Sequence, residues 1–320
     1  MFDSKANNYL INVEVNKYLE SIIRTKLFAN GYIFYGAEGL GKKQTSLYFI
    51  KEIFKQFSST INIEEKITNK NHPDFLVIEP TPLTKVKTKK SPDSEITKKN
   101  NTEIIKIEQI RNVTNFLSQK SIESQKKVVL IIDAHLLNEA ASNCLLKTLE
   151  EPSNGIFILL TSKLNSLLET IKSRCQLVRF RSFSSKQIEL FLKNNLETSK
   201  LAIHKKLNFQ DMVNSANGSP GKLLKNIEIW NEFPEEVISK IDFPLRDNLE
   251  ILKFSKVISE KLEEYQQISL VHLIQQMWWR KTRNRNLVTK LEILKSHIKN
   301  NIQPRLAWEV TLLKIAIEDL

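Results

Sequence analysis

Short apolar runs alternate with longer amphipathic segments through the first half of the chain. The run at 32–35 ends at Gly36, and the segment at 42–57 places its large apolar residues on one face of a helix. The run at 128–132 has five apolar residues in succession, which is typical of a parallel strand buried on both faces. This alternation predicts an α/β layer around a parallel sheet. The other expected elements are strands at 75–78, 156–160 and 177–180 and a helix at 138–150.

Beyond the last expected strand the pattern is helical throughout. Ser184 and Gln187 form a capping box, and the pair at 219–220 places a cap residue before a proline at the first helical position. A break near Pro234 separates a further helical region. We therefore expect an α/β domain at 1–181, a small helical domain at 182–230 and an all-helical C-terminal domain at 231–320.

The segment at 81–102 interrupts the α/β pattern. It contains six lysines, two acidic residues and two prolines, and it has few large apolar residues. This composition predicts a flexible basic loop. A solvated insertion is the favoured interpretation, a phosphate-contacting loop is the alternative, and the role of the loop stays open.

Composition limits the class of protein. The 320 residues carry a net charge of +12, which suits nucleic acid, acidic partners or a lysine-rich surface. The two cysteines, Cys144 and Cys175, are too few for a disulfide framework or a four-cysteine zinc module. No apolar run is long enough to span a membrane, and the first residues lack the pattern of a signal peptide. We expect a cytoplasmic protein without metal or membrane contact.

A glycine-rich segment follows the first strand. Gly36, Gly39, Gly41 and Lys42 match the phosphate loop G-x-x-x-x-G-K, which cradles phosphates at a helix N-terminus. The next position should carry a hydroxyl for Mg²⁺, but it is Lys43, which cannot bind the metal. The loop therefore predicts a nucleotide-binding fold whose metal site is defective.

The second nucleotide-binding element is defective as well. Asp133 follows the strongest strand, where hydrolysing enzymes of this type place an Asp followed by a Glu that positions water. The next residue is Ala134, which cannot do acid or base chemistry. His135 is one position further and is expected to be structural. Gly36, Gly39, Gly41, Lys42 and Asp133 thus form a degenerate nucleotide site; no cofactor is required, and residual ATP binding stays open.

Three strings then identify a family. Residues 143–152 read NCLLKTLEEP, residues 157–162 read FILLTS, and residues 170–175 read TIKSRC. They resemble the AAA+ clamp loaders of bacterial DNA polymerase III, and the resemblance covers about 8–228. It implies an AAA+ P-loop domain, a helical lid and a helical collar. It also implies that Arg174 is an arginine finger acting in trans, whereas Cys175 is expected to be a packed residue.

Further details resemble a structural loader subunit type that does not hydrolyse ATP. They are His72-Pro73-Asp74, the pair Asp133-Ala134, and the segment 218–221 of the lid. In hydrolysing relatives an arginine stands where this chain has Gly221, and the adjacent Lys222 is turned by about 100° around the helix. Some relatives carry a zinc-binding cysteine cluster that this chain lacks.

The resemblance implies a non-hydrolysing structural subunit in a hetero-oligomer. Its expected partners are the motor subunits and the delta subunit of the clamp loader, the sliding clamp and primed DNA. The alternatives are an active motor subunit of the tau or gamma type and a stand-alone DNA-binding module. Subunit order, stoichiometry and any ATPase activity of the chain's own stay open.

Residues 276–305 are strongly basic. The segment has eight basic residues and one acidic residue, and Trp278 and Trp279 precede the first arginine. It predicts either a DNA-phosphate surface or a solvated helix face with tryptophans packed in the collar. The solvated face is favoured, because clamp loaders resemble one another in holding DNA chiefly through their AAA+ domains.

Overall fold

The computed structural model describes residues 12–57, 62–82, 103–150, 155–197, 209–242, 244–300 and 302–318. The chain divides into two compact units, Ile11–Ser182 and Phe183–Leu320. The expected lid and collar lie in the second unit, so the division of that unit at 230/231 stays a prediction. None of the helices in the described part of the chain is long and apolar enough to cross a membrane.

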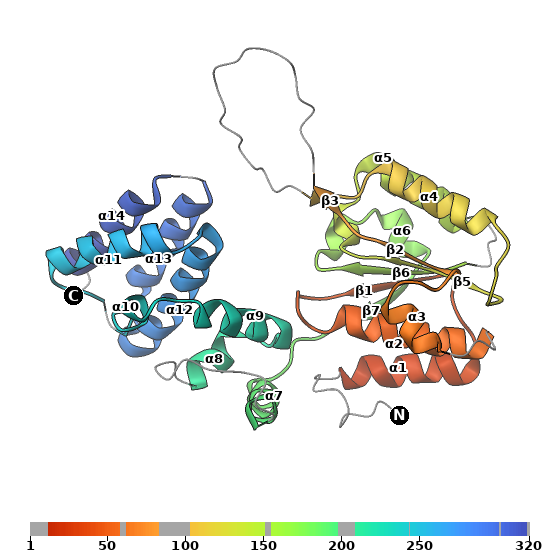
Figure 1. Cartoon of the computed structure of the whole chain (residues 1–320), viewed down its shortest axis with the longest axis horizontal. Coiled ribbons are helices and arrows are strands. Elements are labelled where there is room, and N and C mark those ends of the chain that lie inside the picture. The colour runs from red at the N-terminus through yellow and green to blue at the C-terminus, as the bar shows by residue number, and fades with distance from the viewer. Residues whose placement is uncertain are drawn as a thin grey trace, which may run out of the picture. The chain divides into compact units, whose positions relative to one another are not determined.

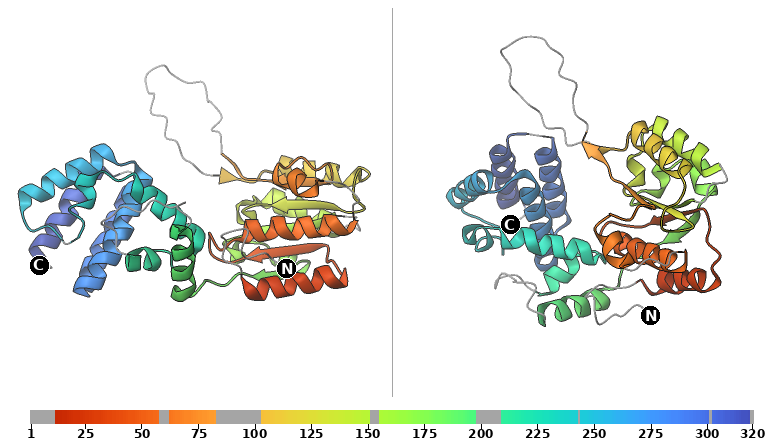
Figure 2. Two further views of the ribbon diagram at one scale, coloured as in Figure 1. Left: turned by 60° about the horizontal axis from the view of Figure 1, so that its bottom comes forward. Right: turned by 45° about the vertical axis from the view of Figure 1, so that its right-hand side comes forward.

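The first unit is an α/β layer structure around a five-stranded parallel sheet with the order β2-β5-β6-β1-β7. Helices cover both faces of the sheet, with α1, α2 and α3 on one side and α4, α5 and α6 on the other (Figures 1 and 2). The strands are β1 (Gly31–Tyr35), β2 (Phe75–Ile78), β5 (Lys127–Ile131), β6 (Gly155–Thr161) and β7 (Gln176–Arg179). The helices are α1 (Val13–Thr25), α2 (Lys42–Phe57), α3 (Ile63–Thr68), α4 (Ile107–Ser118), α5 (Glu139–Glu150) and α6 (Glu169–Ser173).

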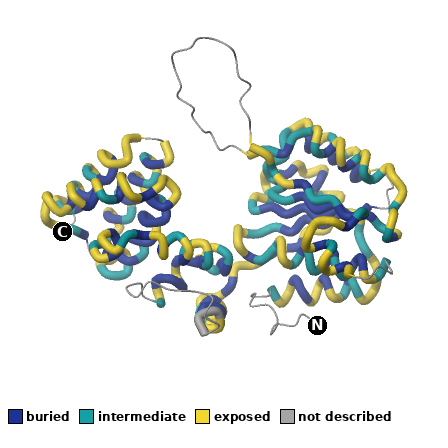
Figure 3. Tube along the Cα trace, viewed as in Figure 1, coloured by how far each residue is buried: buried dark blue, intermediate teal, exposed yellow. Residues whose placement is uncertain are grey.

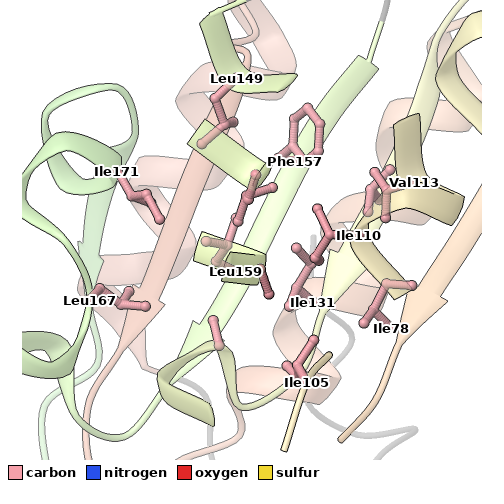
Figure 4. Close-up of a cluster of buried hydrophobic side chains, with 14 of the residues drawn as sticks. Ile78, Ile105, Ile110, Val113, Ile131, Leu149, Phe157, Leu159, Leu167 and Ile171 are labelled. Atoms are coloured by element: carbon pink, nitrogen blue, oxygen red, sulfur yellow. The ribbon is translucent and has the colours of Figure 1, made fainter. Parts of the chain in front are cut away.

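One hydrophobic core of this unit lies between the sheet and the helices α4 to α6. Every residue of β5 and β6 is buried, as expected for central parallel strands covered on both faces (Figure 3). Phe157 and Leu159 of β6 pack with Ile131 of β5, and Ile110 of α4 reaches them from the helical layer (Figure 4). Burial of this apolar surface fixes the strand ends on which the glycine-rich loop and Asp133 stand.

The motif His72-Pro73-Asp74 closes the start of β2. The side chain of Asp74 is completely buried and accepts three backbone N–H groups, from Ile122 at 2.9 Å and from Glu123 and Ser124 at 2.8 Å each. The ring of His72 accepts the N–H of Asp74 at 3.1 Å. The motif therefore attaches the turn before β5 to the start of β2.

The second unit is helical throughout its described residues. Three buried tryptophans hold it together, because each indole N–H has a partner: Trp230 donates to Ser269, Trp278 to the carbonyl of Ile241, and Trp308 to Gln267. The helices are α7 (Ser185–Glu197), α8 (Phe209–Ser215), α9 (Pro220–Asn231), α10 (Glu235–Ile238), α11 (Asn248–Lys261), α12 (Glu264–Thr282), α13 (Arg285–Lys299) and α14 (Pro304–Glu318).

Most of the expected elements are confirmed, with shifts of one residue at their ends. The capping box is confirmed too, because the backbone N–H of Ser184 donates to Gln187 and that of Gln187 donates back to the Ser184 hydroxyl. The expected loop at 81–102 is wrong at its start, where Thr81–Pro82 forms the short strand β3 and pairs with β4, Glu103–Ile104. The rest of that expectation lies outside the described residues. Helices α1, α3, α4 and α6 were not predicted.

Candidate phosphate loop and surface arginine

The glycine-rich loop joins β1 to α2 as the motif requires. Gly39 and Gly41 have φ values of 74° and 83°, a region that favours glycine. Gly36 has φ 150°, and a Cβ there would lie 2.4 Å from the carbonyl oxygen of Phe180. The sequence thus folds into a phosphate loop at the N-terminus of a 16-residue helix.

Lys42 closes this loop on itself. Its ammonium donates to the carbonyl oxygens of Gly36 at 2.7 Å and Ala37 at 2.6 Å. Burial lowers the pKa of Lys42, and the nearby charges of Asp133 and Glu38 partly oppose that shift. A phosphate that enters the loop must therefore compete with two carbonyl acceptors for this lysine.

Lys43 occupies the position of the metal-binding hydroxyl and points to another partner. Its ammonium lies 3.5 Å from Glu79, one residue beyond β2, and Lys70 lies 2.9 Å from the same carboxylate. The hydrogen bond from Lys70 is the main cause that lowers the pKa of Glu79. The loop and its lysines fit the phosphates of a nucleotide. They do not fit Mg²⁺, because the nearby carboxylate of Glu79 is already paired with the ammonium groups of Lys43 and Lys70.

The segment after β5 lacks a water-positioning acid. Asp133 has φ 50° and begins a short 3₁₀ turn, η1 (Ala134–Leu136), in which Ala134 is fully buried. The ring of His135 lies 3.4 Å from the hydroxyl of Thr161, at the end of β6. Burial is the main cause that lowers the pKa of His135. Asp133 therefore lies at the carboxyl edge of the sheet, and the residue next to it offers only a methyl group.

Arg174 lies on the surface of the first unit, just after α6. Its guanidinium donates to Glu150 at 2.5 Å and to the carbonyl of Thr170 at 3.0 Å. The side chains of Arg174 and Glu150 are 37% and 47% exposed. The arginine is thus held in a defined position and stays open to solvent. Sequence reasoning missed Glu150, because a pair formed across 24 positions depends on the packing of α5 beside α6.

The two cysteines are packing residues. Cys175 lies against Gly31, where an added Cβ would come within 2.6 Å of its sulfur. Burial raises the pKa of Cys175 to about 12, so its thiol stays protonated at neutral pH. Cys144 packs against the core of the first unit. The prediction that Cys175 is a packed residue is confirmed.

In the second unit, Gly221 is the second residue of α9. Ser219 caps this helix by accepting the N–H of Lys222 at 3.2 Å, and Pro220 is its first residue. The predicted helix start is confirmed. Among the described residues, no group of three or more histidine, cysteine or acidic side chains could hold a metal ion.

Most basic residues of the segment at 276–305 form ion pairs within the helical unit. Arg280 binds the buried carboxylate of Asp211 at 2.9 Å. The other ion pairs join Lys281 to Asp242, Lys290 to Glu318, Lys295 to Glu292 and Arg305 to Glu309. These pairs reduce the charge available for a phosphate backbone, which favours the solvated helix face over an extended DNA surface.

The parallel sheet, the phosphate loop at its carboxyl edge and the separate helical unit define an α/β protein of the AAA+ type. The family model described as "DNA polymerase III, delta subunit" matches residues 11–184, more than half of the chain. The chain therefore belongs to this DNA polymerase III subunit family. A second model, described as "Cyanobacterial DNA polymerase III delta prime, C-terminal domain", matches residues 191–315.

Individual relatives agree with this assignment. The chain is 30% identical over 181 residues to the DNA polymerase III subunit delta′ of Bacillus subtilis, which covers 55% of the chain and 49% of the relative. It is 45% identical over 73 residues to the delta′ subunit of Haemophilus influenzae, 22% of each chain. The matched part of the chain thus spans about half the length of the Bacillus subtilis relative and about a fifth of the Haemophilus influenzae relative. A gamma subunit-related protein from Thermotoga maritima shares the fold with a TM-score of 0.53 at 18% identity, covering 93% of this chain and 98% of that one.

Proposed function

We propose that this chain is a non-hydrolysing delta′-type subunit of a DNA polymerase III clamp loader and supplies Arg174 to the ATP site of a neighbouring subunit. In this role it assembles with motor subunits and a delta subunit through its helical unit, in the cytoplasm. The complex places a sliding clamp on primed DNA. The names of the relatives support the complex, and the chain's own site supports the division of labour.

The observation that carries the proposal is the contrast between the two sites. The phosphate loop keeps its shape, but Lys43 and Ala134 stand where a metal-binding hydroxyl and a water-positioning acid are needed. Arg174, in contrast, keeps the planar fork that binds phosphate in two places, and it lies at the surface. The chain therefore has an arginine that can bind the phosphate of another subunit's ATP, while it lacks the residues needed to hydrolyse ATP in its own loop.

The test is an Arg174→Ala variant in the reconstituted complex. We expect the variant to fold and assemble, because the side chain of Arg174 forms hydrogen bonds only with Glu150 and the carbonyl of Thr170 among the described residues. DNA-stimulated ATPase and clamp loading should both fall. An arginine finger contributes about 10³–10⁵ in rate at the site it completes, and the loss for the whole complex is smaller because the other sites continue to turn over.

Two further variants test whether the effect is specific to the guanidinium of Arg174. Arg174→Lys should restore little activity, because an ammonium lacks the bidentate fork. Arg179→Ala removes an exposed arginine of β7 in the same unit and should leave ATPase and loading intact. Wild-type loading by an assembled Arg174→Ala complex would refute the finger and leave a scaffolding role.

The alternatives have less support. An active motor subunit needs a metal ligand and a catalytic acid, and Lys43 instead pairs with Glu79. A stand-alone DNA-binding module needs free basic charge, and five of the eight basic residues at 276–305 form ion pairs within the unit.

A further inference from the structure

A pocket of about 710 Å³ lies within the helical unit, where the start of α7 and the turn after α8 meet the end of α12. Its volume is in the range of sites that bind small molecules. Every lining residue belongs to the Phe183–Leu320 unit, so the pocket is separate from the phosphate loop. The side chains that carry the argument are those of Ser185, Asn217, Gln276, Trp279 and Arg283.

An aromatic ring and a cation form one wall of the pocket. Trp279 is 40% exposed, whereas Trp230, Trp278 and Trp308 are at most 1% exposed. The guanidinium carbon of Arg283 lies 5.7 Å from the centroid of the Trp279 ring. An exposed indole beside a guanidinium offers a stacking surface for a base and a charge for its phosphate.

One of the polar side chains that line the same pocket has an oxygen without a protein partner. The side-chain oxygen of Gln276 is buried and has no hydrogen-bond donor among the described residues. A buried acceptor of this kind costs free energy unless a ligand or water satisfies it. Ser185 is the first residue of α7, a 13-residue helix whose N-terminus favours an anion.

Charge balance selects an anion as the ligand. Arg280 also lines the pocket, but the buried carboxylate of Asp211 neutralises it at 2.9 Å. Arg283 has no carboxylate within ion-pair distance among the described residues. The pocket therefore combines one cation, one helix N-terminus, an exposed indole and amide groups, and it lacks a free carboxylate among its lining residues.

We propose that this pocket binds a nucleoside phosphate, with the base stacked on Trp279 and hydrogen-bonded to Gln276, and the phosphate at Arg283. The ligand is either a free nucleotide or one unit of a single-stranded DNA. This assignment is independent of the finger and of the degenerate phosphate loop.

The test uses the full chain and two probes, deoxyadenosine monophosphate and an oligodeoxyadenylate of about ten nucleotides. Binding is followed by tryptophan fluorescence, because Trp279 is the exposed tryptophan, and by equilibrium dialysis or anisotropy with labelled probes. Similar affinity for both probes identifies a free-nucleotide site, and much tighter binding of the oligonucleotide identifies a single-strand site.

Variants connect the binding to the pocket. Trp279→Ala should weaken binding by about tenfold or more, as loss of one stacked base does. Gln276→Leu should weaken it as well. Arg283→Gln should weaken binding and reduce the salt dependence of oligonucleotide binding by about 0.7 in slope. Arg285→Gln is the matched control, because it removes an exposed arginine two positions away that does not line the pocket.

Three outcomes overturn the proposal. The first is no binding of either probe. The second is equal weakening by Arg283→Gln and Arg285→Gln, which would indicate unspecific charge attraction. The third is equal competition by an acidic peptide without phosphate, which would make the pocket a protein-docking site.

Discussion

The buried carboxylate of Asp74 gives the most direct test of what stabilises the α/β unit. One carboxylate oxygen accepts the N–H of Ile122, and the other accepts the N–H groups of Glu123 and Ser124. An Asp74→Asn variant keeps the shape of the side chain but replaces one acceptor oxygen by an NH₂ donor. In its best orientation the amide oxygen accepts two N–H groups, and the NH₂ faces the third.

The magnitude follows from this geometry. One hydrogen bond to a charged acceptor is lost, at about 1.5–3 kcal/mol, and its N–H donor is left buried without a partner. The two remaining bonds weaken, because bonds to an ionised acceptor are about twice as strong as neutral ones. We therefore expect the free energy of unfolding to fall by about 3–5 kcal/mol, a large part of a typical domain's 5–15 kcal/mol.

Urea denaturation resolves this effect within the α/β unit. All four tryptophans lie in the helical unit, so their fluorescence reports on that unit, whereas far-UV circular dichroism reports on both. Asp74→Asn should lower the urea midpoint of the circular dichroism transition and leave the fluorescence transition in place. Glu123→Gln is the control, because its pair with Lys66 is partly exposed and contributes at most about 1 kcal/mol. A loss below 1 kcal/mol in Asp74→Asn would show that the three hydrogen bonds do not stabilise this unit.

Three other predictions concern catalysis, the finger and pH. The isolated chain should show no magnesium-dependent ATP turnover above background in a phosphate-release assay; turnover that Lys42→Ala abolishes would favour the motor-subunit alternative. Glu150→Gln should leave the ATPase activity of the complex at wild-type level or raise it, by up to about fivefold at limiting subunit concentration. The reason is that the ion pair between Glu150 and Arg174 is partly exposed, contributes at most about 1 kcal/mol, and competes with the neighbour's phosphate for Arg174. A defect like that of Arg174→Ala would instead make Glu150 a positioning residue. Burial lowers the pKa of His72 from its ordinary value of 6.5, so the stability it contributes is present above 6.5 and is lost as the pH falls towards its lowered pKa in the folded protein. Urea midpoints at about pH 7.5 and 5.5 should therefore differ, and His72→Gln should reduce that difference; an unchanged difference would assign the pH dependence to other groups.

The pattern of the sequence was sufficient for the strands but not for their order. The expected strand at 75–78 and helix at 42–57 coincide with β2 and α2. The spacing of apolar residues along the chain indicates which positions are buried locally, and these two elements are buried at their apolar positions. The order β2-β5-β6-β1-β7 depends on crossovers between distant segments, which a local pattern does not encode.

The same limit applies to the candidate site. The role of the glycines in the phosphate loop could be predicted from the sequence, because the backbone conformations of this loop favour glycine over other residue types. The partners of Lys43 and Arg174 could not, because Glu79 and Glu150 come close only when the layers pack. Asp74 illustrates the difference well: the motif was noticed in the sequence, but its three N–H donors stand about fifty positions away.

The retained Lys42 does not require a bound nucleotide to explain it. Its ammonium satisfies two carbonyl oxygens of the loop, and Gly36 is fixed by its contact with Phe180. Both interactions hold the loop in its shape without a phosphate. A phosphate loop can therefore keep its glycines and its lysine after the metal position has become a lysine, because the residues that shape the turn are not those that bind Mg²⁺. In this chain the loop connects β1 to α2 and is held by its own contacts, and Arg174 is the residue of the α/β unit for which we propose a role at another subunit's ATP.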